Sequence, residues 1–274
     1  MTEPVNIDLS AVPKTLLLPL LGRAHFSQKI YSPIHDKKAL ELITTLNYDF
    51  ENLLNVANVK TSALFWMARA YHFDEAIKAH LKKHPKAVIV NLGCGLDTSF
   101  NRVDNGHLTW VNVDLPEVIK LRERLLPPTA REIAIQASVL DYSWMDEVKN
   151  LGSDLFFFAG GLFMYFTNEQ IKALFIQLAE CFPGSPLIFD NISPKGLNSA
   201  NKMLQKSGMT DALLQWSVTD AKIIEQWSPK IKVLAQHAYF TGIKNKYPFP
   251  WRYKLLMYLL DLSHKSGMIY LSFD

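Results

Sequence analysis

From residue 87 onward, short apolar runs alternate with helix-like segments, and this alternation constrains the fold more than any other feature of the chain. The runs are continuously apolar, as expected for strands buried on both faces, and strands that alternate with helices pair in parallel. The pattern therefore predicts a doubly wound, mostly parallel α/β sheet with seven strands. The predicted strands are residues 87–92, 108–113, 132–136, 155–159, 186–189, 230–234 and 268–274.

Helical periodicity dominates the part of the chain before the first predicted strand. Between residues 63 and 81, apolar residues recur three and four positions apart, and the pattern stops at Lys82-Lys83-His84-Pro85. We expect residues 1–85 to form an N-terminal helical cap within a single domain of residues 1–274.

A polar segment interrupts the alternation after the fifth strand. Residues 193–214 are rich in Gly, Ser, Asn and Lys and precede another helix-like stretch. Ligands of open α/β sheets bind beyond the carboxyl ends of the strands, so this insertion would form a helical lid over that edge. A pair of surface helices without a ligand role fits the same residues equally well. The cofactor-binding half would occupy residues 86–192, and the lid with the C-terminal strands residues 193–274.

Charge and composition indicate which partners the chain lacks. Its 29 basic and 26 acidic residues are mixed along the sequence, so the net charge of +3 makes no basic patch for nucleic acid. The longest nearly apolar run, residues 155–166, is shorter than the roughly 20 residues that span a membrane. Two distant cysteines and an N-terminus without a signal-peptide pattern favour a cytoplasmic protein with no nucleic-acid or membrane partner. An oligomeric state does not follow from the sequence.

A loop with two glycines follows the first predicted strand and precedes a helix-like segment. Glycines in such a turn let the backbone approach a ligand, so a nucleotide-type cofactor should lie over Gly93, Cys94 and Gly95. A dinucleotide-binding loop would have a third glycine at Thr98 and room for a phosphate at the helix N-terminus. Here Asp97 places a carboxylate where that phosphate would lie. S-adenosylmethionine, which has no phosphate, fits this loop better.

Two further acids follow the second and third predicted strands. Asp114 comes 19 residues after Gly95, near the spacing of about 20 at which dinucleotide folds bind both ribose hydroxyls. Asp141 could accept a hydrogen bond from an adenine amino group. Either acid could instead cap the helix that follows it, since Asp is a favoured N-cap residue. We favour the ribose for Asp114, whereas for Asp141 both interpretations stay open.

Four segments of the chain match, in order, the pattern of a known family. They are Ala68-Arg-Ala-Tyr-His-Phe-Asp74, Val90-Asn-Leu-Gly-Cys-Gly-Leu-Asp-Thr98, Val113-Asp-Leu-Pro-Glu117 and Gly161-Leu-Phe-Met-Tyr-Phe-Thr167. Together they resemble the leucine carboxyl methyltransferase family, which includes bacterial polyketide-type O-methyltransferases. The resemblance implies a Rossmann-like methyltransferase sheet and S-adenosylmethionine as the cofactor.

The resemblance also implies how the cofactor is bound. Arg69 would pair with the cofactor carboxylate, a role that suits the planar guanidinium. The glycine loop would line the methionine portion, Asp114 the ribose and Asp141 the adenine. The set of residues expected to contact the cofactor is Arg69, Gly93, Cys94, Gly95, Asp114, Leu115, Asp141, Tyr142 and Gly160.

At one position the chain departs from this family pattern. The family usually has a Glu before the Gly-x-x-Met-Tyr segment, where it holds the cofactor ammonium, and this chain has Gly160. A backbone carbonyl of Ala159 or Gly160 could replace it, but a charge-assisted hydrogen bond contributes about 1.5–3 kcal/mol against about 1 kcal/mol for a neutral one. We expect weaker cofactor binding or a changed role. An Arg common after the Asp-Thr pair is also absent, being Ser99, with Arg102 nearby as a substitute.

Methyl transfer from a sulfonium is an in-line displacement, so the protein mainly supplies alignment and electrostatics. The sequence holds no metal-ligand or covalent-nucleophile motif. Tyr165 is best placed to contact the substrate, and His237 and Tyr239 are weaker candidates. Since no general base is evident, we expect an O-methyltransferase acting on a small-molecule carboxyl or acidic hydroxyl group.

Two other functions stay open at this point. Gly160 is compatible with a non-catalytic protein that retains the fold and binds S-adenosylmethionine or a partner. An NAD-dependent oxidoreductase is disfavoured by Asp97 and by the missing third glycine.

Overall fold

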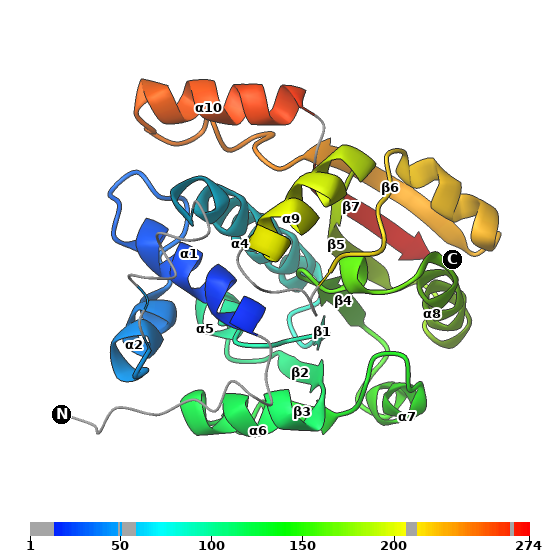
Figure 1. The fold of residues 1–274 in the computed structure, drawn as a ribbon. Coiled ribbons are helices and arrows are strands. Elements are labelled where there is room, and N and C mark those ends of the chain that lie inside the picture. Colours follow the sequence, from blue (N-terminus) through cyan, green and yellow to red (C-terminus); the bar gives the residue numbers. More distant parts are fainter. Residues whose placement is uncertain (1–13, 49, 51–58, 207–212, 264–265) are drawn as a thin grey trace.

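The apolar runs form one seven-stranded sheet at the centre of the molecule (Figure 1). The computed structural model describes residues 14–48, 50, 59–206, 213–263 and 266–274. The strand order is β3-β2-β1-β4-β5-β7-β6. Neighbours from β3 to β5 pair in parallel, and β7 is antiparallel to β5 and β6, which confirms the predicted mostly parallel sheet. The strands are β1 (Val88–Leu92), β2 (Thr109–Asp114), β3 (Glu132–Gln136), β4 (Leu155–Ala159), β5 (Pro186–Ile192), β6 (Ile231–Ala238) and β7 (Ser266–Phe273).

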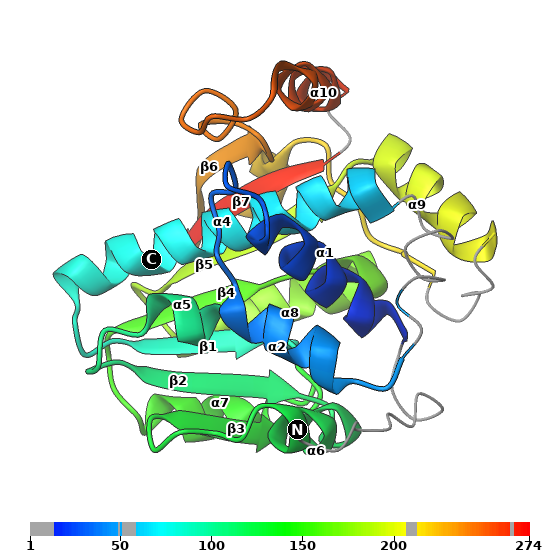
Figure 2. The same ribbon diagram turned by 90° about the vertical axis from the view of Figure 1, so that its left-hand side faces the viewer.

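Helices cover both faces of the sheet, which makes the fold doubly wound (Figures 1 and 2). Alternate residues of a strand point to opposite faces, so Ile89 joins one core and Val88 and Val90 join the other. The first core lies under α4 (Val59–Lys83), α5 (Ser99–Val103) and α6 (Pro116–Leu125). The second lies under α7 (Ser143–Lys149), α8 (Asn168–Cys181) and the 3-10 helix η4 (Ala221–Trp227).

The predicted N-terminal helices are present as η1 (Lys14–Leu16), α1 (Leu17–Ser27), α2 (Lys37–Thr45) and α4. Residues 1–13, 49 and 51–58 of the expected cap lie outside the described residues. Helix α1 runs beside α4 (Figure 2). This approach needs a glycine, because a Cβ at Gly22 would lie 2.3 Å from the Trp66 ring.

A network of buried charges ties these helices to the loop that follows β1. Its centre is Asp36, the N-cap residue of α2, which is fully buried. The Asp36 carboxylate accepts hydrogen bonds from Arg23 Nε of α1 at 2.9 Å and from Arg102 Nη1 of α5 at 2.6 Å. The Thr98 hydroxyl donates to it as well. Because Arg102 also pairs with Asp74 of α4, side chains from α1, α2, α4 and α5 meet in this network.

The two arginines determine the ionisation of Asp36. Burial favours the neutral acid, but Arg102 and Arg23 outweigh it and hold the pKa of Asp36 below its usual value. For Asp74, burial outweighs Arg102 and raises the pKa of the carboxyl. A buried charge that loses its partner is strongly destabilising, so the network is expected to form as a unit.

Two helices lie outside this arrangement. Helix α9 (Pro194–Lys206) follows β5 on the side toward which β1 and β2 point (Figure 2). Helix α10 (Trp251–Leu262) lies outside both helical layers, with Met257 buried and Trp251 and Leu262 exposed. Among the described residues, no helix is long and apolar enough to span a bilayer.

Replacing Asp36 by Asn should lower the free energy of unfolding by about 3–5 kcal/mol, because Arg23 and Arg102 then lose the carboxylate between them. Since the pKa of Asp36 lies below its usual value of about 3.9, this stabilisation is complete above that pH and is lost as the pH falls through the lower folded pKa. Urea unfolding followed by circular dichroism measures the change. The control Glu41→Gln removes an exposed ion pair with Lys38 on the same helix and should cost under about 1 kcal/mol. Equal losses in the two variants would contradict the role of Asp36.

Candidate functional site

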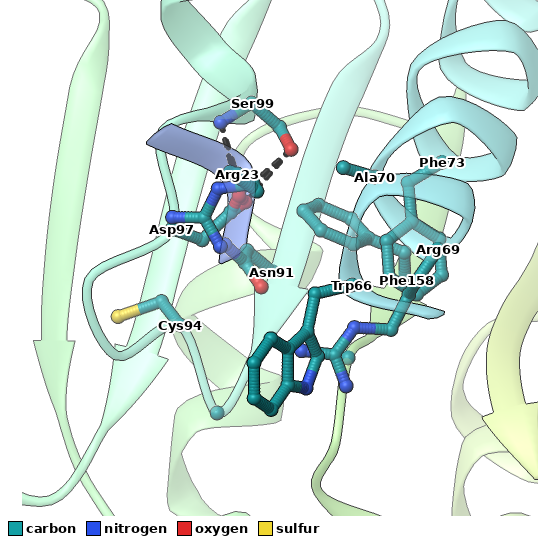
Figure 3. A pocket seen from close by; sticks show the side chains of 12 residues that line it. Arg23, Trp66, Arg69, Ala70, Phe73, Asn91, Cys94, Asp97, Ser99 and Phe158 are labelled. Atoms are coloured by element: carbon teal, nitrogen blue, oxygen red, sulfur yellow. Dashed lines mark hydrogen bonds between the residues drawn. The ribbon is translucent and has the colours of Figure 1, made fainter. Parts of the chain in front are cut away.

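A small cavity lies where the carboxyl ends of β1 and β4 meet α1 and α4 (Figure 3). Its volume is about 40 Å³. Four of the residues expected to contact the cofactor, Arg69, Gly93, Cys94 and Gly160, are brought together here. The lining residues are Arg23, Trp66, Arg69, Ala70, Phe73, Asn91, Gly93, Cys94, Asp97, Ser99, Phe158 and Gly160.

The loop after β1 needs glycine at two positions. Gly93 has φ of 65° and Gly95 has φ of 44°, a left-handed backbone that residues with a side chain rarely adopt. Neighbouring side chains also leave no room, because a Cβ at Gly93 would lie 2.7 Å from Leu162 and a Cβ at Gly95 would lie 2.7 Å from Leu16. The loop is therefore a tight turn in contact with two leucines.

Buried arginines hold the carbonyl groups of this loop. Arg122 Nη1 donates to the carbonyl oxygens of Gly95 at 3.0 Å and Asp97 at 2.6 Å. Arg23 Nη2 donates to the carbonyl oxygen of Leu96 at 2.9 Å. Three successive carbonyls are thus held by the two guanidiniums, which fixes the path of the backbone.

The side chain of Cys94 has no acid–base role here. Burial raises the pKa of the Cys94 thiol far above its usual range, so the thiol stays protonated at neutral pH. At this position the backbone is the part available to a ligand.

Asp114 joins the end of β2 to the glycine loop. Its Oδ2 accepts a hydrogen bond from the Gly95 amide at 2.8 Å, and its Oδ1 accepts one from the Leu115 amide at 2.8 Å. Burial raises the pKa of the Asp114 carboxyl, although both hydrogen bonds counteract it. The capping interpretation is wrong for this acid, because the N-cap residue of α6 is Leu115 and no side chain caps the helix.

The remaining residues of the expected set follow the neighbouring strands. Leu115 is 41% exposed beyond β2. Asp141 is exposed beyond β3, and its Oδ1 accepts a hydrogen bond from the Ser143 amide at 3.2 Å. It therefore bonds to the first turn of α7, while the exposed carboxylate can still accept from a ligand. Tyr142 is half-buried beside it.

Arg69 projects from α4 into the cavity and is paired on one side. Its Nη1 donates to Asp190 Oδ2 at 2.9 Å, and its side chain is 12% exposed. Burial disfavours the charged guanidinium, yet Asp190 outweighs this and raises the pKa of Arg69. The contact takes one of the five N–H donors of a guanidinium.

Asp190, near the carboxyl end of β5, was not among the predicted site residues. Its Oδ2 accepts from Arg69 and from the Tyr239 hydroxyl, both at 2.9 Å, and its Oδ1 accepts from the Gly161 amide at 2.6 Å. It is only 4% exposed. The signal in the sequence was an acid at the end of an apolar run, directly after Phe189, where an unpaired carboxylate would be costly.

Asn91 was also missed, although it directly precedes the glycine loop. It is 2% exposed, lines the cavity, and its Nδ2 atom has no hydrogen-bond partner among the described residues. In Figure 3 its side-chain oxygen points toward the space between Cys94 and Trp66. A buried amide without its full set of partners in a cavity is typical of a ligand-binding site.

The candidate acid–base residues lie in different surroundings. Tyr165 ends the 3-10 helix η2 (Phe163–Tyr165); burial raises the pKa of its hydroxyl, although a hydrogen bond with Thr15 lowers it. Burial and Asp190 raise the pKa of Tyr239 well above its usual value, so Tyr239 stays protonated. His237 packs against the ring of His72, with ring centroids 4.9 Å apart.

Arg102 does not reach the cavity. It bonds to Asp36, Asp74, Thr98 and Ser99, so it stabilises the helices instead of substituting for an arginine at the cofactor. Within the described part of the chain, no group of three or more His, Cys, Asp or Glu side chains could hold a metal ion.

Comparison with known proteins identifies the family. The model of the family "leucine carboxyl methyltransferase" matches residues 21–179. The tetracenomycin polyketide synthesis O-methyltransferase TcmP of Streptomyces glaucescens is 30% identical over 232 residues, which is 84% of each chain. The S-adenosyl-L-methionine-dependent methyltransferase dpfgK of Gibberella zeae is 23% identical over 249 residues, 83% of this chain and 82% of its own.

A solved structure supports the fold. The DUF574 family protein of Streptomyces avermitilis has a TM-score of 0.61 and covers 93% of this chain and 97% of its own, at 13% identity. The family match spans Arg69, the glycine loop, Asp114 and Tyr165. The chain belongs to the leucine carboxyl methyltransferase family and is an S-adenosylmethionine-dependent methyltransferase.

Proposed function

We propose that this methyltransferase transfers the methyl group to a hydroxyl or carboxyl oxygen of a small-molecule acceptor. The observation that carries the proposal is the single cavity in which Arg69, Asn91 and the glycine loop meet at the carboxyl edge of the sheet. The 30% identity to TcmP, an O-methyltransferase of polyketide synthesis, supports oxygen as the methylated atom.

The polar groups around the cavity fit S-adenosylmethionine. Arg69 would bind its carboxylate, and the backbone of residues 93–95 would line its methionine portion. Asp114 would bind the ribose, with Asp141 and its neighbours at the adenine. The buried Asn91 side chain, which lines the cavity, supports this fit. The cavity of about 40 Å³ is too small for the whole cofactor, so side chains around it would have to shift when the cofactor binds.

The chain contributes alignment and exclusion of water. When bound, S-adenosylmethionine supplies an electrophilic methyl group on a positively charged sulfur. Phe158, Phe73 and Trp66 line the cavity and keep water from it. Among the described residues that line the cavity there is no histidine, so the arrangement suits an acceptor that is anionic or readily becomes so.

The acceptor would extend toward a second cavity of about 490 Å³. Trp216, Trp227 and Ile223 form much of its apolar wall. The wall is attached to η2, since the Gln215 amide donates to the Met164 carbonyl at 2.7 Å and Gln215 Nε2 donates to the Tyr165 carbonyl at 2.9 Å. Helix α9, whose first residue Pro194 belongs to this wall, would act as the lid.

Isothermal titration of the purified protein with S-adenosylmethionine should show micromolar binding. Asp114→Asn should weaken that binding by about 10- to 100-fold, because a charge-assisted hydrogen bond to the ribose is lost and the Gly95 amide loses its anionic partner. The control Glu123→Gln changes an exposed acid on the helix after Asp114 and should leave the affinity unchanged. An absence of binding by the wild-type protein would overturn the proposed function.

Tyr165→Phe should lower kcat by about tenfold or more while the dissociation constant of S-adenosylmethionine stays the same, since the hydroxyl would orient the acceptor. Transfer of a labelled methyl group to a panel of phenols and carboxylic acids measures both the acceptor class and kcat. The exposed Tyr258→Phe on α10 serves as the control. Wild-type protein that binds the cofactor yet methylates no acceptor in the panel or in a metabolite extract would favour the non-catalytic alternative.

A further inference from the structure

We propose that Asp190 is a positioning residue that fixes Arg69 at the amino-acid end of the cofactor. This inference rests on the proposed binding of S-adenosylmethionine over the glycine loop. It concerns how the guanidinium that would bind the ligand carboxylate is held in place.

The register of the sheet places Asp190 beside Gly160, the position without an acidic side chain. Ala159 of β4 pairs with Phe189 of β5, so the next residues along, Gly160 and Asp190, lie on neighbouring strands at the same level. The Gly161 amide donates to Asp190 Oδ1 at 2.6 Å, which joins the two strand ends directly. A carboxylate thus lies one strand away from position 160 and is bound to the arginine that lines the cavity.

Steric crowding explains why no acidic side chain is present directly after β4, at positions 160 and 161. A Cβ at Gly160 would be 2.9 Å from the ring of Phe73, which is 4% exposed and packs against Phe158 with ring centroids 5.2 Å apart. Gly161 has φ of 71°, and a Cβ there would be 2.6 Å from Arg69 Nη1. A side chain at either position would displace an aromatic ring or the arginine itself.

The charges around the cavity account for the pairing of Arg69 with Asp190. Arg23 and Arg69 bring two positive charges to the cavity, while the Asp97 carboxylate already accepts hydrogen bonds from Ser99. Asp190 balances Arg69 by a buried ion pair of 2.9 Å. A pair held in this geometry keeps the guanidinium in place, so little side-chain entropy is lost when the ligand carboxylate binds.

Tyr239 keeps Asp190 in its role as an acceptor. Its hydroxyl donates to Asp190 Oδ2 at 2.9 Å, and its pKa is raised well above the usual value by burial and by Asp190. The phenol therefore remains a donor at neutral pH. With Arg69, Gly161 and Tyr239 around it, the carboxylate has three donors, which fix it beside Arg69.

The test compares two ligands that differ only at the amino-acid end. S-adenosylhomocysteine carries the ammonium and carboxylate, whereas 5′-methylthioadenosine lacks both. Asp190→Asn, in which the side chain keeps its shape, should weaken the binding of S-adenosylhomocysteine by about 10- to 100-fold in calorimetric titration and leave the affinity for methylthioadenosine unchanged. If Asp190 has a purely structural role, the affinities for both ligands should fall together, and that result would overturn the proposal. Equal affinities of the variant and the wild type for S-adenosylhomocysteine would overturn it as well.

A double-mutant cycle tests whether Asp190 acts through Arg69. In an Arg69→Ala background, Asp190→Asn should cause no further loss of S-adenosylhomocysteine affinity, whereas additive losses would contradict the proposal. Asp261→Asn, which removes a partly buried ion pair with Lys244 that does not line the cavity, is the matched control and should change the affinity by less than about fivefold. If circular dichroism shows that Asp190→Asn is unfolded, Asp190→Glu replaces it with the same expected selectivity between the two ligands. Wild-type protein that binds neither ligand would refute the proposed function itself, a result distinct from an unaffected variant.

Discussion

The buried charge of Asp36 holds together parts of the chain that the sheet does not connect. Arg23 lies between this carboxylate and the carbonyl of Leu96, and it also lines the cavity. The N-terminal helices and the glycine loop are therefore one energetic unit. Loss of a charge in this unit would disturb the shape of the cavity as well as the free energy of unfolding.

A second buried ion pair bears more on the cavity than on the free energy of unfolding. Arg69 and Asp190 are 121 residues apart in sequence and meet at the cavity wall. Their side chains are 12% and 3% exposed, so each charge depends on the other. Whereas the Asp36 network holds the glycine loop, this pair holds the one of its two residues, Arg69, that lines the cavity, and under the proposal above its orientation would bear on cofactor affinity.

Much of the fold could be predicted because its signals are local. The strand predicted at 132–136 agrees with β3, and the helical periodicity of residues 63–81 lies within α4, since both signals depend on neighbours in sequence. The strand predicted at 186–189 extends to Ile192 in the structure. Because Asp190 and Asn191 are polar, the apolar run ends early and Asp190 falls outside the predicted strand.

Only the part of the candidate site that depends on short segments could be predicted. The glycine loop and Asp114 follow strands within short segments, and a pattern could identify them. The partners of Asp190 and Asp36 come from distant elements, and no periodicity relates them. Arg102 shows most clearly what a sequence pattern cannot predict. Its position in the sequence suggested a place near the cofactor, whereas its side chain binds Asp36 and Asp74.

The close approach of Phe73 to Gly160 also limits which side chains position 160 accepts. A Cβ at this position would lie 2.9 Å from the aromatic ring and 3.6 Å from Arg69 Nε. An acid introduced at position 160 would therefore have to displace the ring or be accompanied by a smaller residue at position 73.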